Sequence, residues 1–488
     1  MKDRSKKPIS RRQFLISGSL LATATLAACA APAAPAAPAA TTAPAEAPAA
    51  TEAPAAEPTA TEAPAEPAPE PTVAVNNYGK DTNATVIWHG LGGADGATFA
   101  TMLEMYAKEF PDRGVRSELY NWDIFFQKFP TAVAAGTPPD IALYHAAEVP
   151  QMSSQGINTP MDDMMAANNI PKDDFNKSVM EVVTVDGKVM AVPFDNHGWN
   201  CYINTSLFEG TGFSPDNLPK NGDEFIKFAL KATVDEAGKH PDESGFNADK
   251  VKVWATTYTW PRFTMPSTWF QWYGQGQGGQ FDKATNKARL NSEKSTAAVQ
   301  YWHDLMYKHK VCPPALPGVT QGGDLYKTNS VAIMWEGTWM LNFFKDNPDV
   351  EKVTKAVTMN SLSPDGAGGQ KIDSHILTIP TGVKQDGIER ASHLITWLSN
   401  NGKTWATSGQ IPARLSVQQD PAVQAIWSVK AAAEAFGKQG YTETPHKAFI
   451  ELQTAWETAV SAALANTTPL PDALNEGNQA IQAILDRG

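Results

Sequence analysis

The chain has 488 residues and a formal net charge of −12 at pH 7. This acidic balance argues against nucleic acid and anionic lipid headgroups as partners, because both would be repelled. The chain is longer than one domain usually runs, and its 42% hydrophobic residues and 14 tryptophans can fill substantial cores, so we expect two lobes.

Residues 1–28 are predicted to be an export signal. Basic residues precede an apolar run, 14–28, that is too short for the roughly 20 residues of a membrane-spanning helix. The segment 10–15, Ser-Arg-Arg-Gln-Phe-Leu, resembles the twin-arginine export motif; a Sec signal with a chance Arg-Arg pair is the alternative. The segment 26–29, Leu-Ala-Ala-Cys, resembles a bacterial lipobox, and an unmodified spacer cysteine is its alternative. The export signal and the lipobox both lead to Cys29. We therefore expect an extracytoplasmic lipoprotein anchored to the cell membrane.

Residues 29–77 are expected to be the lipidated cysteine followed by a disordered tether. From Ala30 to about Thr72 the sequence is almost entirely Ala, Pro, Thr and Glu. It has no aromatic residue and no aliphatic side chain larger than alanine, so burial cannot offset the entropy lost on ordering. Proline at this density favours extended polyproline II, which makes a semi-rigid spacer. A low-complexity tail without function is the alternative.

After the tether, the chain alternates predicted strands and helices. Short apolar or alternating runs predict strands at 85–88, 115–120 and 140–144. A helix is predicted before Pro111, where apolar residues recur at a spacing of three or four: Phe99, Met102, Leu103, Tyr106 and Phe110. A second helix is predicted at 125–135. This β-α-β-α-β order predicts an α/β fold with a parallel sheet.

Motifs of common enzymes are missing from the sequence. The glycine-rich stretch 90–96 matches neither nucleotide-binding motif, and neither G-x-S-x-G nor H-E-x-x-H occurs. His303 and His309 have no carboxylate at metal-ligand spacing. We therefore expect no catalysis, no cofactor and no metal ion, although glycosidase carboxylates have no fixed spacing and leave an enzyme as an alternative.

The two remaining cysteines, Cys201 and Cys312, leave two interpretations open. They could pair in an oxidising compartment, and two buried free thiols fit the sequence equally well.

Tryptophans and tyrosines cluster beside glycine and polar residues. One stretch carries Trp254, Tyr258, Trp260, Trp269, Trp272 and Tyr273; other clusters contain Trp335 with Trp339, and Trp199. Sugars stack their C–H faces on indole rings, and their hydroxyls need polar partners. These clusters therefore suggest a carbohydrate-binding wall. Ordinary core packing is the alternative, and we expect it for Trp302 and Trp397, which recur with apolar residues at helical spacing.

Several motifs, in order along the chain, resemble those of the extracellular solute-binding proteins of ABC importers, most closely the branch that includes maltose- and glycerol-phosphate-binding proteins. The segment 125–144 resembles their helix–Gly–Pro-Asp–strand signature. Residues 187–194 and 201–208 resemble "G-K-x-x-x-V-P … Y-N-x-x-L-F". Residues 328–339 resemble "G-x-x-A-M-x-x-x-G-x-W", and 411–417 resemble "x-P-A-R-x-S-V". The tryptophan of "P-x-T-W-x-E-F" is missing at 218–225.

The resemblance implies a two-lobed periplasmic-binding-protein-like fold, with a ligand cleft between lobes joined by crossing strands. We assign 78–195 and 317–372 to lobe 1, and 196–316 and 373–488 to lobe 2. Ligand binding would shift a hinge equilibrium toward a closed form. The closed form would be recognised by the permease of an ABC transporter, and we expect a monomer.

The resemblance also implies ligand-binding residues. Tyr144 ends a strand at the cleft edge, and Asp195, Asn196 and His197 lie on the first crossing. Trp339 matches the tryptophan that stacks on sugar, and Arg414 matches the arginine of P-A-R. Chemistry and position add further candidates: Trp122, Trp260, Trp269, Trp272, Glu336 and His375.

The sequence thus predicts a lipid-anchored receptor that captures a carbohydrate, either an oligosaccharide or a glycoside, for an ABC importer. A receptor for a glycerophosphodiester or a polyamine is one alternative. A surface glycoside hydrolase that uses Asp195 and Glu336 is another. The identity, length and linkage of the sugar stay open.

Overall fold

The structure is a computed structural model that describes residues 73–80, 82–258, 280–314, 322–359, 362–364, 366 and 369–487. The expected export signal, Cys29 and nearly all of the expected tether lie outside these residues, as do Trp260, Trp269 and Trp272. Among the described residues, none of the helices has the length and apolar character needed to cross a membrane.

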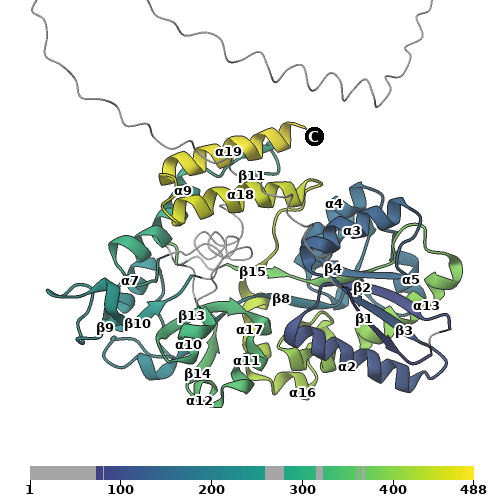
Figure 1. Ribbon diagram of the computed structural model, residues 1–488, viewed down its shortest axis with the longest axis horizontal. Coiled ribbons are helices and arrows are strands. Elements are labelled where there is room, and N and C mark those ends of the chain that lie inside the picture. Colours follow the sequence, from purple (N-terminus) through teal and green to yellow (C-terminus); the bar gives the residue numbers. More distant parts are fainter. Residues whose placement is uncertain are drawn as a thin grey trace, which may run out of the picture. The chain divides into compact units, whose positions relative to one another are not determined.

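The first large sheet has six strands in the order β1-β3-β2-β4-β16-β7. Its strands are β1 (Ala74–Tyr78), β2 (Thr85–His89), β3 (Val115–Leu119), β4 (Ile141–His145), β7 (Val192–Pro193) and β16 (His375–Thr378). The strand β2 runs parallel to both β3 and β4, and α2 (Gly93–Glu109) and α3 (Trp122–Ala134) connect them. The predicted β-α-β-α-β unit is therefore confirmed (Figure 1).

The two connecting helices form for the reasons that the sequence suggested. Helix α2 buries Phe99, Met102, Leu103 and Tyr106, so its apolar stripe faces the sheet. Helix α3 begins after Asn121, whose side chain accepts a hydrogen bond from the backbone N–H of Asp123 at 2.9 Å. This cap stabilises the first turn.

The expected end of the tether at residue 77 is wrong. Residues 74–78 form β1, which pairs antiparallel with β3, with Ala74 opposite Leu119 and Tyr78 opposite Val115. The sequence Ala-Val-Asn-Asn-Tyr is largely exposed and has little hydrophobic signal. Its stability comes from hydrogen bonds to the edge of a sheet formed by residues far along the chain, and a local pattern does not report these bonds.

The second large sheet is built around β8 (Asp195–Asn204), whose ten residues are all buried. The order is β18-β15-β8-β13-β10-β9, and β14 and β17 also pair with β8. The other strands are β9 (Val234–Asp235), β10 (Val251–Thr256), β13 (Val331–Gly337), β14 (Thr354–Val357), β15 (Gln370–Asp373), β17 (Ile411–Pro412) and β18 (Gly440–Tyr441). Because β8 pairs with four strands, it connects widely separated parts of the chain.

The remaining elements cover these sheets. Two small hairpins are β5 (Thr184–Val185) with β6 (Lys188–Val189), and β11 (Phe281–Asp282) with β12 (Lys287–Ala288). The other α-helices are α4 (Val149–Ser154), α5 (Asp162–Ala167), α6 (Lys177–Val183), α7 (Gly222–Ala232), α9 (Glu293–His303), α10 (Gly322–Lys327), α11 (Leu341–Asp346), α12 (Pro348–Glu351), α13 (Gln385–Asn400), α14 (Gly402–Trp405), α15 (Leu415–Gln418), α16 (Pro421–Gln424), α17 (Trp427–Gln439), α18 (Phe449–Leu464) and α19 (Leu470–Asp486).

Two large hydrophobic cores define two lobes. The first contains Ile87, Phe125 and Leu394 and lies against the six-stranded sheet. The second contains Phe225, Ile333 and Trp456 and includes the buried faces of α18 and α19. Trp397 belongs to the first core and Trp302 to the second, which confirms that both are core residues.

The chain divides between these lobes differently from our assignment in two places. The strand β13, expected in lobe 1, pairs with β8 and β10 in the second sheet. The strand β16 and helix α13, expected in lobe 2, pack into the first core. Both strands are buried along their whole length. A strand that is buried along its whole length has no alternating pattern from which its sheet could be predicted. Its sheet is determined by the strands with which it pairs.

The structure resolves the alternatives for the two cysteines of the body. Cys201 and Cys312 are both free and both buried. Burial raises the pKa of each thiol, which keeps them protonated and unreactive.

Candidate functional site

A cavity of about 320 Å³ lies where β8 and the β15–β16 segment pass between the two sheets. The loop after β2 and the first turn of α2 contribute Gly90, Leu91, Gly92, Gly93, Ala94 and Asp95. Three indole rings and three imidazole rings line it: Trp122, Trp199, Trp339, His145, His197 and His375. The other lining residues are Gly198, Lys371, Asp373 and Gln410. Aromatic rings with a few polar groups in a concave site are typical of a small-molecule binding site.

Two tryptophans of the cavity each lie against a glycine. A Cβ at Gly90 would overlap the ring of Trp122, and a Cβ at Gly337 would overlap the ring of Trp339. Both indoles are half-buried. Trp199 is buried and packs edge-on against Trp339, with ring centroids 5.6 Å apart. The glycines thus let two flat indole rings lie close to the backbone at the cavity wall.

The glycine-rich loop is held by His89, at the end of β2. The backbone N–H of Leu91 donates to His89 Nδ1 at 3.2 Å, and His89 Nε2 lies 2.7 Å from Ser117 Oγ. Burial, with a contribution from the charge of His375, lowers the pKa of His89 to about 3. His89 is therefore neutral, and its two ring nitrogens fix the start of the loop.

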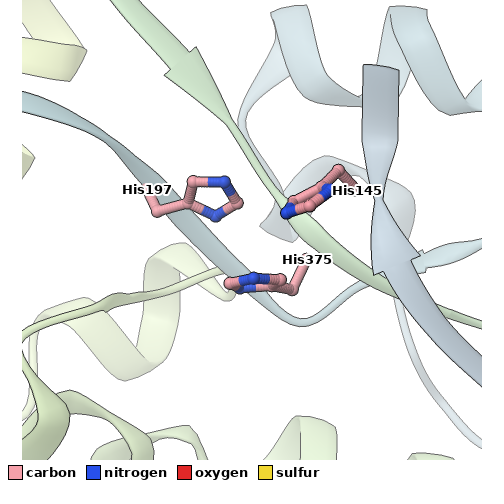
Figure 2. Close-up of side chains that lie close together, drawn as sticks. All are labelled: His145, His197 and His375. Atoms are coloured by element: carbon pink, nitrogen blue, oxygen red, sulfur yellow. The ribbon is translucent and has the colours of Figure 1, made fainter. Parts of the chain in front are cut away.

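Three histidines approach one another in the cavity. His145 ends β4 and lies directly opposite His375, the first residue of β16. His197 lies on β8, opposite Asp373 of β15. The ring centroids of His197 and His375 are 4.3 Å apart, and those of His145 and His375 are 5.2 Å apart. Figure 2 shows the three rings grouped around a small common space.

Asp195 lies beneath these histidines and orients two of them. Its Oδ1 lies 3.0 Å from His197 Nδ1, and its Oδ2 lies 2.7 Å from His375 Nδ1. It also accepts hydrogen bonds from the backbone N–H of His375 and from Trp405 Nε1, each at 2.8 Å. Burial alone would raise the pKa of Asp195, but these partners lower it well below its usual range. The carboxylate is therefore ionised although it is completely buried.

Asp95 is a cavity-lining residue with one hydrogen-bonded and one unpartnered carboxyl oxygen. Its Oδ2 accepts from Gln410 Nε2 at 2.7 Å, and Gln410 Oε1 accepts from Thr338 Oγ1 at 2.5 Å. Its Oδ1 has no hydrogen-bond partner among the described residues, and burial raises the pKa of Asp95. A buried carboxyl oxygen without a partner is costly.

Lys371 is the one lysine or arginine among the described residues that line the cavity, and the carboxylate of Glu443 neutralises its charge. Lys371 Nζ lies 3.5 Å from Glu443 Oε1, and both side chains are buried. Burial raises the pKa of Glu443, whereas for Lys371 the nearby carboxylates Glu443 and Asp373 overcome burial and raise its pKa. Lys371 is therefore ion-paired rather than available as an isolated positive charge for an anionic ligand.

Four of the predicted ligand-binding residues line the cavity, and five others do not. Trp122, His197, Trp339 and His375 line it. Tyr144 is completely buried and donates to Asn158 Oδ1 at 2.9 Å. Arg414 donates from Nε to Asp174 Oδ2 at 2.5 Å, away from the cavity lining.

The other predicted residues outside the cavity lining are Asp195, Asn196 and Glu336, all of them buried. Glu336 Oε1 accepts from the backbone N–H of Gly337 at 3.0 Å. Because neither Asp195 nor Glu336 reaches the cavity wall, the carboxylate pair of the glycosidase alternative gains no support. Tyr258, from the aromatic stretch, packs on Trp302 in the second core.

Sequence reasoning missed His145, Gly198, Lys371, Asp373, Gln410 and the glycine-rich segment 90–95, which joins β2 to α2, as cavity residues. The loop carried a signal that could have been used, since it is glycine-rich and directly follows the first strand of a β-α-β unit. In such folds, ligands bind beyond the carboxyl ends of the strands. His145 follows the same rule, because it is the last residue of β4.

Comparison with known proteins places this geometry in a family. Residues 101–433 match the model of a family described as bacterial extracellular solute-binding protein. A binding protein of Brucella abortus is 29% identical over 136 residues, which is 28% of this chain and 32% of that relative. The chain therefore spans about a third of the length of the Brucella relatives that it matches.

Two further comparisons cover more of the chain. The arabinooligosaccharide-binding protein of Halalkalibacterium halodurans is 22% identical over 337 residues, 67% of this chain and 70% of that protein. The maltose-bound structure of MalE3 from T. maritima is 19% identical and covers 82% of this chain and 99% of its own, with a TM-score of 0.69. The chain therefore shares the fold of MalE3, which confirms the two-lobed fold that the sequence predicted. The chain belongs to the family of bacterial extracellular solute-binding proteins, whose members bind solutes and are not enzymes.

Proposed function

We propose that this protein captures a carbohydrate in the cavity between its lobes and delivers it to the permease of an ABC importer. The observation that carries the proposal is the pair of half-buried indoles, Trp122 and Trp339, each lying on a glycine at the cavity wall. Flat aromatic faces stack on the C–H faces of sugars, and Asp95 and Gln410 supply hydrogen-bonding groups for hydroxyls beside them.

The names of relatives support the same class of ligand. One relative is an arabinooligosaccharide-binding protein, and a structure with the same fold was solved with maltose. The cavity volume of about 320 Å³ suits a ligand of a few sugar rings or a glycoside. A glycerophosphodiester is less well matched, because Lys371 is already paired with Glu443.

Ligand capture would couple to movement of the lobes. The cavity takes Trp122 and residues 90–95 from the first lobe, and it takes Trp199 of β8 and Trp339, which follows β13, from the second. A sugar that contacts both sets of residues stabilises the arrangement in which they are close, so binding shifts a hinge equilibrium toward closure. The permease would recognise this closed form.

The N-terminal part of the chain would keep the receptor at the membrane. We propose that residues 1–28 are removed after export by the twin-arginine route, that Cys29 carries a lipid, and that the Ala/Pro/Glu-rich segment is a tether. A tethered monomer would have a raised local concentration at its transporter. Replacement Cys29→Ser should move the protein from the membrane fraction to the soluble fraction; unchanged fractionation would rule out the lipid anchor.

A thermal-shift screen of the mature protein tests the ligand class. The panel contains arabino-oligosaccharides, maltodextrins and lactose, with a glycerophosphodiester and a polyamine as the competing classes. A ligand that binds only the folded state raises the melting temperature, by an amount that grows with its concentration above Kd. We expect stabilisation by at least one saccharide. Stabilisation by the phosphodiester or the polyamine alone would overturn the carbohydrate proposal.

A further inference from the structure

We propose that His145, His197 and His375 form a binding site for a divalent transition-metal ion of the zinc class inside the cavity. No sequence motif predicts this site, because the three residues are separated by 52 and 178 positions and show no metal-ligand spacing. The folded chain brings them together from three strands.

The geometry brings three nitrogen donors to one place. One ring nitrogen from each histidine lies within 4.8 Å of the others, and all three residues are buried. Because His145 and His375 are directly opposite each other on antiparallel strands, their side chains share one face of the sheet. His197 approaches from β8, and Figure 2 shows its ring beside the other two.

Carboxylate oxygens lie near Nδ1 of all three histidines. The Nδ1 atoms of His197 and His375 both face Asp195, at 3.0 and 2.7 Å. His145 Nδ1 lies 3.7 Å from Oε2 of the buried Glu148. Carboxylates beside ligating histidines are the usual arrangement in metal sites, where they orient the imidazole ring.

The charges around the cluster also favour a cation. Asp95, Asp195 and Asp373 lie close to the histidines, and the ammonium group of Lys371 is paired with Glu443. A bound metal ion would supply a positive charge that these carboxylates attract.

Three imidazole nitrogens indicate which ions would bind. Nitrogen donors suit Zn²⁺, Cu²⁺ and Ni²⁺, whereas Ca²⁺ and Mg²⁺ prefer oxygen ligands. Sites with three protein ligands keep a further position for water or a ligand. Since the histidines line the cavity, that position would face the space in which we place the sugar.

Calorimetric titration of the metal-free mature protein with Zn²⁺ alone tests the proposal. The protein is prepared without a polyhistidine tag and without sugar. We expect one Zn²⁺ per chain with a Kd in the micromolar range or tighter, and no heat with Ca²⁺ or Mg²⁺. His145→Gln, His197→Gln and His375→Gln should each weaken binding at least about tenfold. The matched control is His303→Gln, because His303 ends α9, contacts Asn466 and does not line the cavity; the Zn²⁺ affinity of this variant should not change.

A second measurement protects against misfolded variants. Co²⁺ added to the unaltered protein should give visible absorption bands typical of nitrogen coordination, and Zn²⁺ should remove them. The proposal is overturned if the unaltered protein binds no Zn²⁺. It is also overturned if each of the three single variants binds Zn²⁺ as tightly as the unaltered protein. Because no sugar is present, such a failure would leave the carbohydrate proposal standing; sugar titrations in the presence of a chelator test that proposal separately.

Discussion

Two segments that both resemble family motifs have different roles in the structure. Trp339 follows β13 and lines the cavity, with its ring against Gly337. Arg414 follows β17 and lies outside the cavity lining, where it binds Asp174 and Asn400. A motif thus identifies a position in the fold, whereas the direction of a side chain depends on the partners that the rest of the chain supplies. The predictions below use this difference.

Trp339→Ala should have the largest effect on sugar binding. The substitution removes an indole face at the cavity wall, so we expect the free energy of sugar binding to weaken by about 1–3 kcal/mol with the fold intact. Calorimetry with the saccharide found in the screen measures this loss. Trp88→Ala is the matched control, since Trp88 is also a half-buried indole but packs on Tyr120 outside the cavity lining. Equal losses in both variants would refute a specific role for Trp339.

Trp122→Ala should weaken sugar binding less, by about 1 kcal/mol. One side of this ring is already covered by imidazoles, with centroids 4.4 Å from His145 and 6.1 Å from His375. Less of the indole is therefore left for a ligand. The same calorimetric titration compares the two variants. A larger loss of sugar affinity for Trp122→Ala than for Trp339→Ala would reverse our ranking of the two tryptophans.

Gly337→Ala tests whether the glycine positions Trp339. The backbone of Gly337, with φ −71°, suits any residue, so an added methyl group causes no backbone strain. The methyl would overlap the indole of Trp339 and displace it. We expect sugar affinity to fall about two- to fivefold, corresponding to a few tenths to 1 kcal/mol. In the double variant Gly337→Ala with Trp339→Ala, the glycine substitution should have no additional effect; an additive loss would contradict the positioning role.

Arg414→Ala should leave sugar affinity unchanged and lower stability by about 1–3 kcal/mol, because it removes a largely buried hydrogen-bonded ion pair. Thermal unfolding and sugar titration of the same variant separate the two effects. A tenfold loss of sugar affinity would instead return Arg414 to the binding site.

Asp174, the partner of Arg414, should make the stability of the folded protein fall at acidic pH. Burial would raise the pKa of Asp174, but hydrogen bonds from Ser416 and Arg414 lower it below the usual value of 3.8. A folded-state pKa below the unfolded one gives stability that is present above pH 3.8 and is lost as the pH falls through the folded value. The stability difference between the unaltered protein and Asp174→Asn should therefore shrink below about pH 4. A difference that stays constant on acidification would contradict this assignment.

Much of the fold could be predicted because its signals are local. The apolar spacing of Phe99 to Tyr106 predicted α2, and the order of strands and helices predicted the parallel part of the first sheet. The membership of β13 and β16 could not be predicted, since both are buried strands whose sheet depends on pairing with distant residues.

The site was predictable only in part for the same reason. Indole rings beside glycine indicated Trp339, and a strand crossing indicated His197. Asp195 was predicted to contact the ligand because the family resemblance places it on the first crossing between the lobes. The structure shows it bound to His197, His375 and Trp405 instead. The convergence of His145 on these residues depends on the register between β4 and β16, which no local pattern contains.

The most direct test of the central claim is calorimetric titration of the double variant Trp122→Ala with Trp339→Ala. The titrant is the saccharide that stabilises the unaltered protein, and circular dichroism and thermal unfolding confirm that the variant is folded. We predict that the unaltered protein binds one saccharide per chain and that the double variant loses binding at least about tenfold. Unchanged affinity in the folded double variant would place the sugar elsewhere and contradict a carbohydrate site in this cavity.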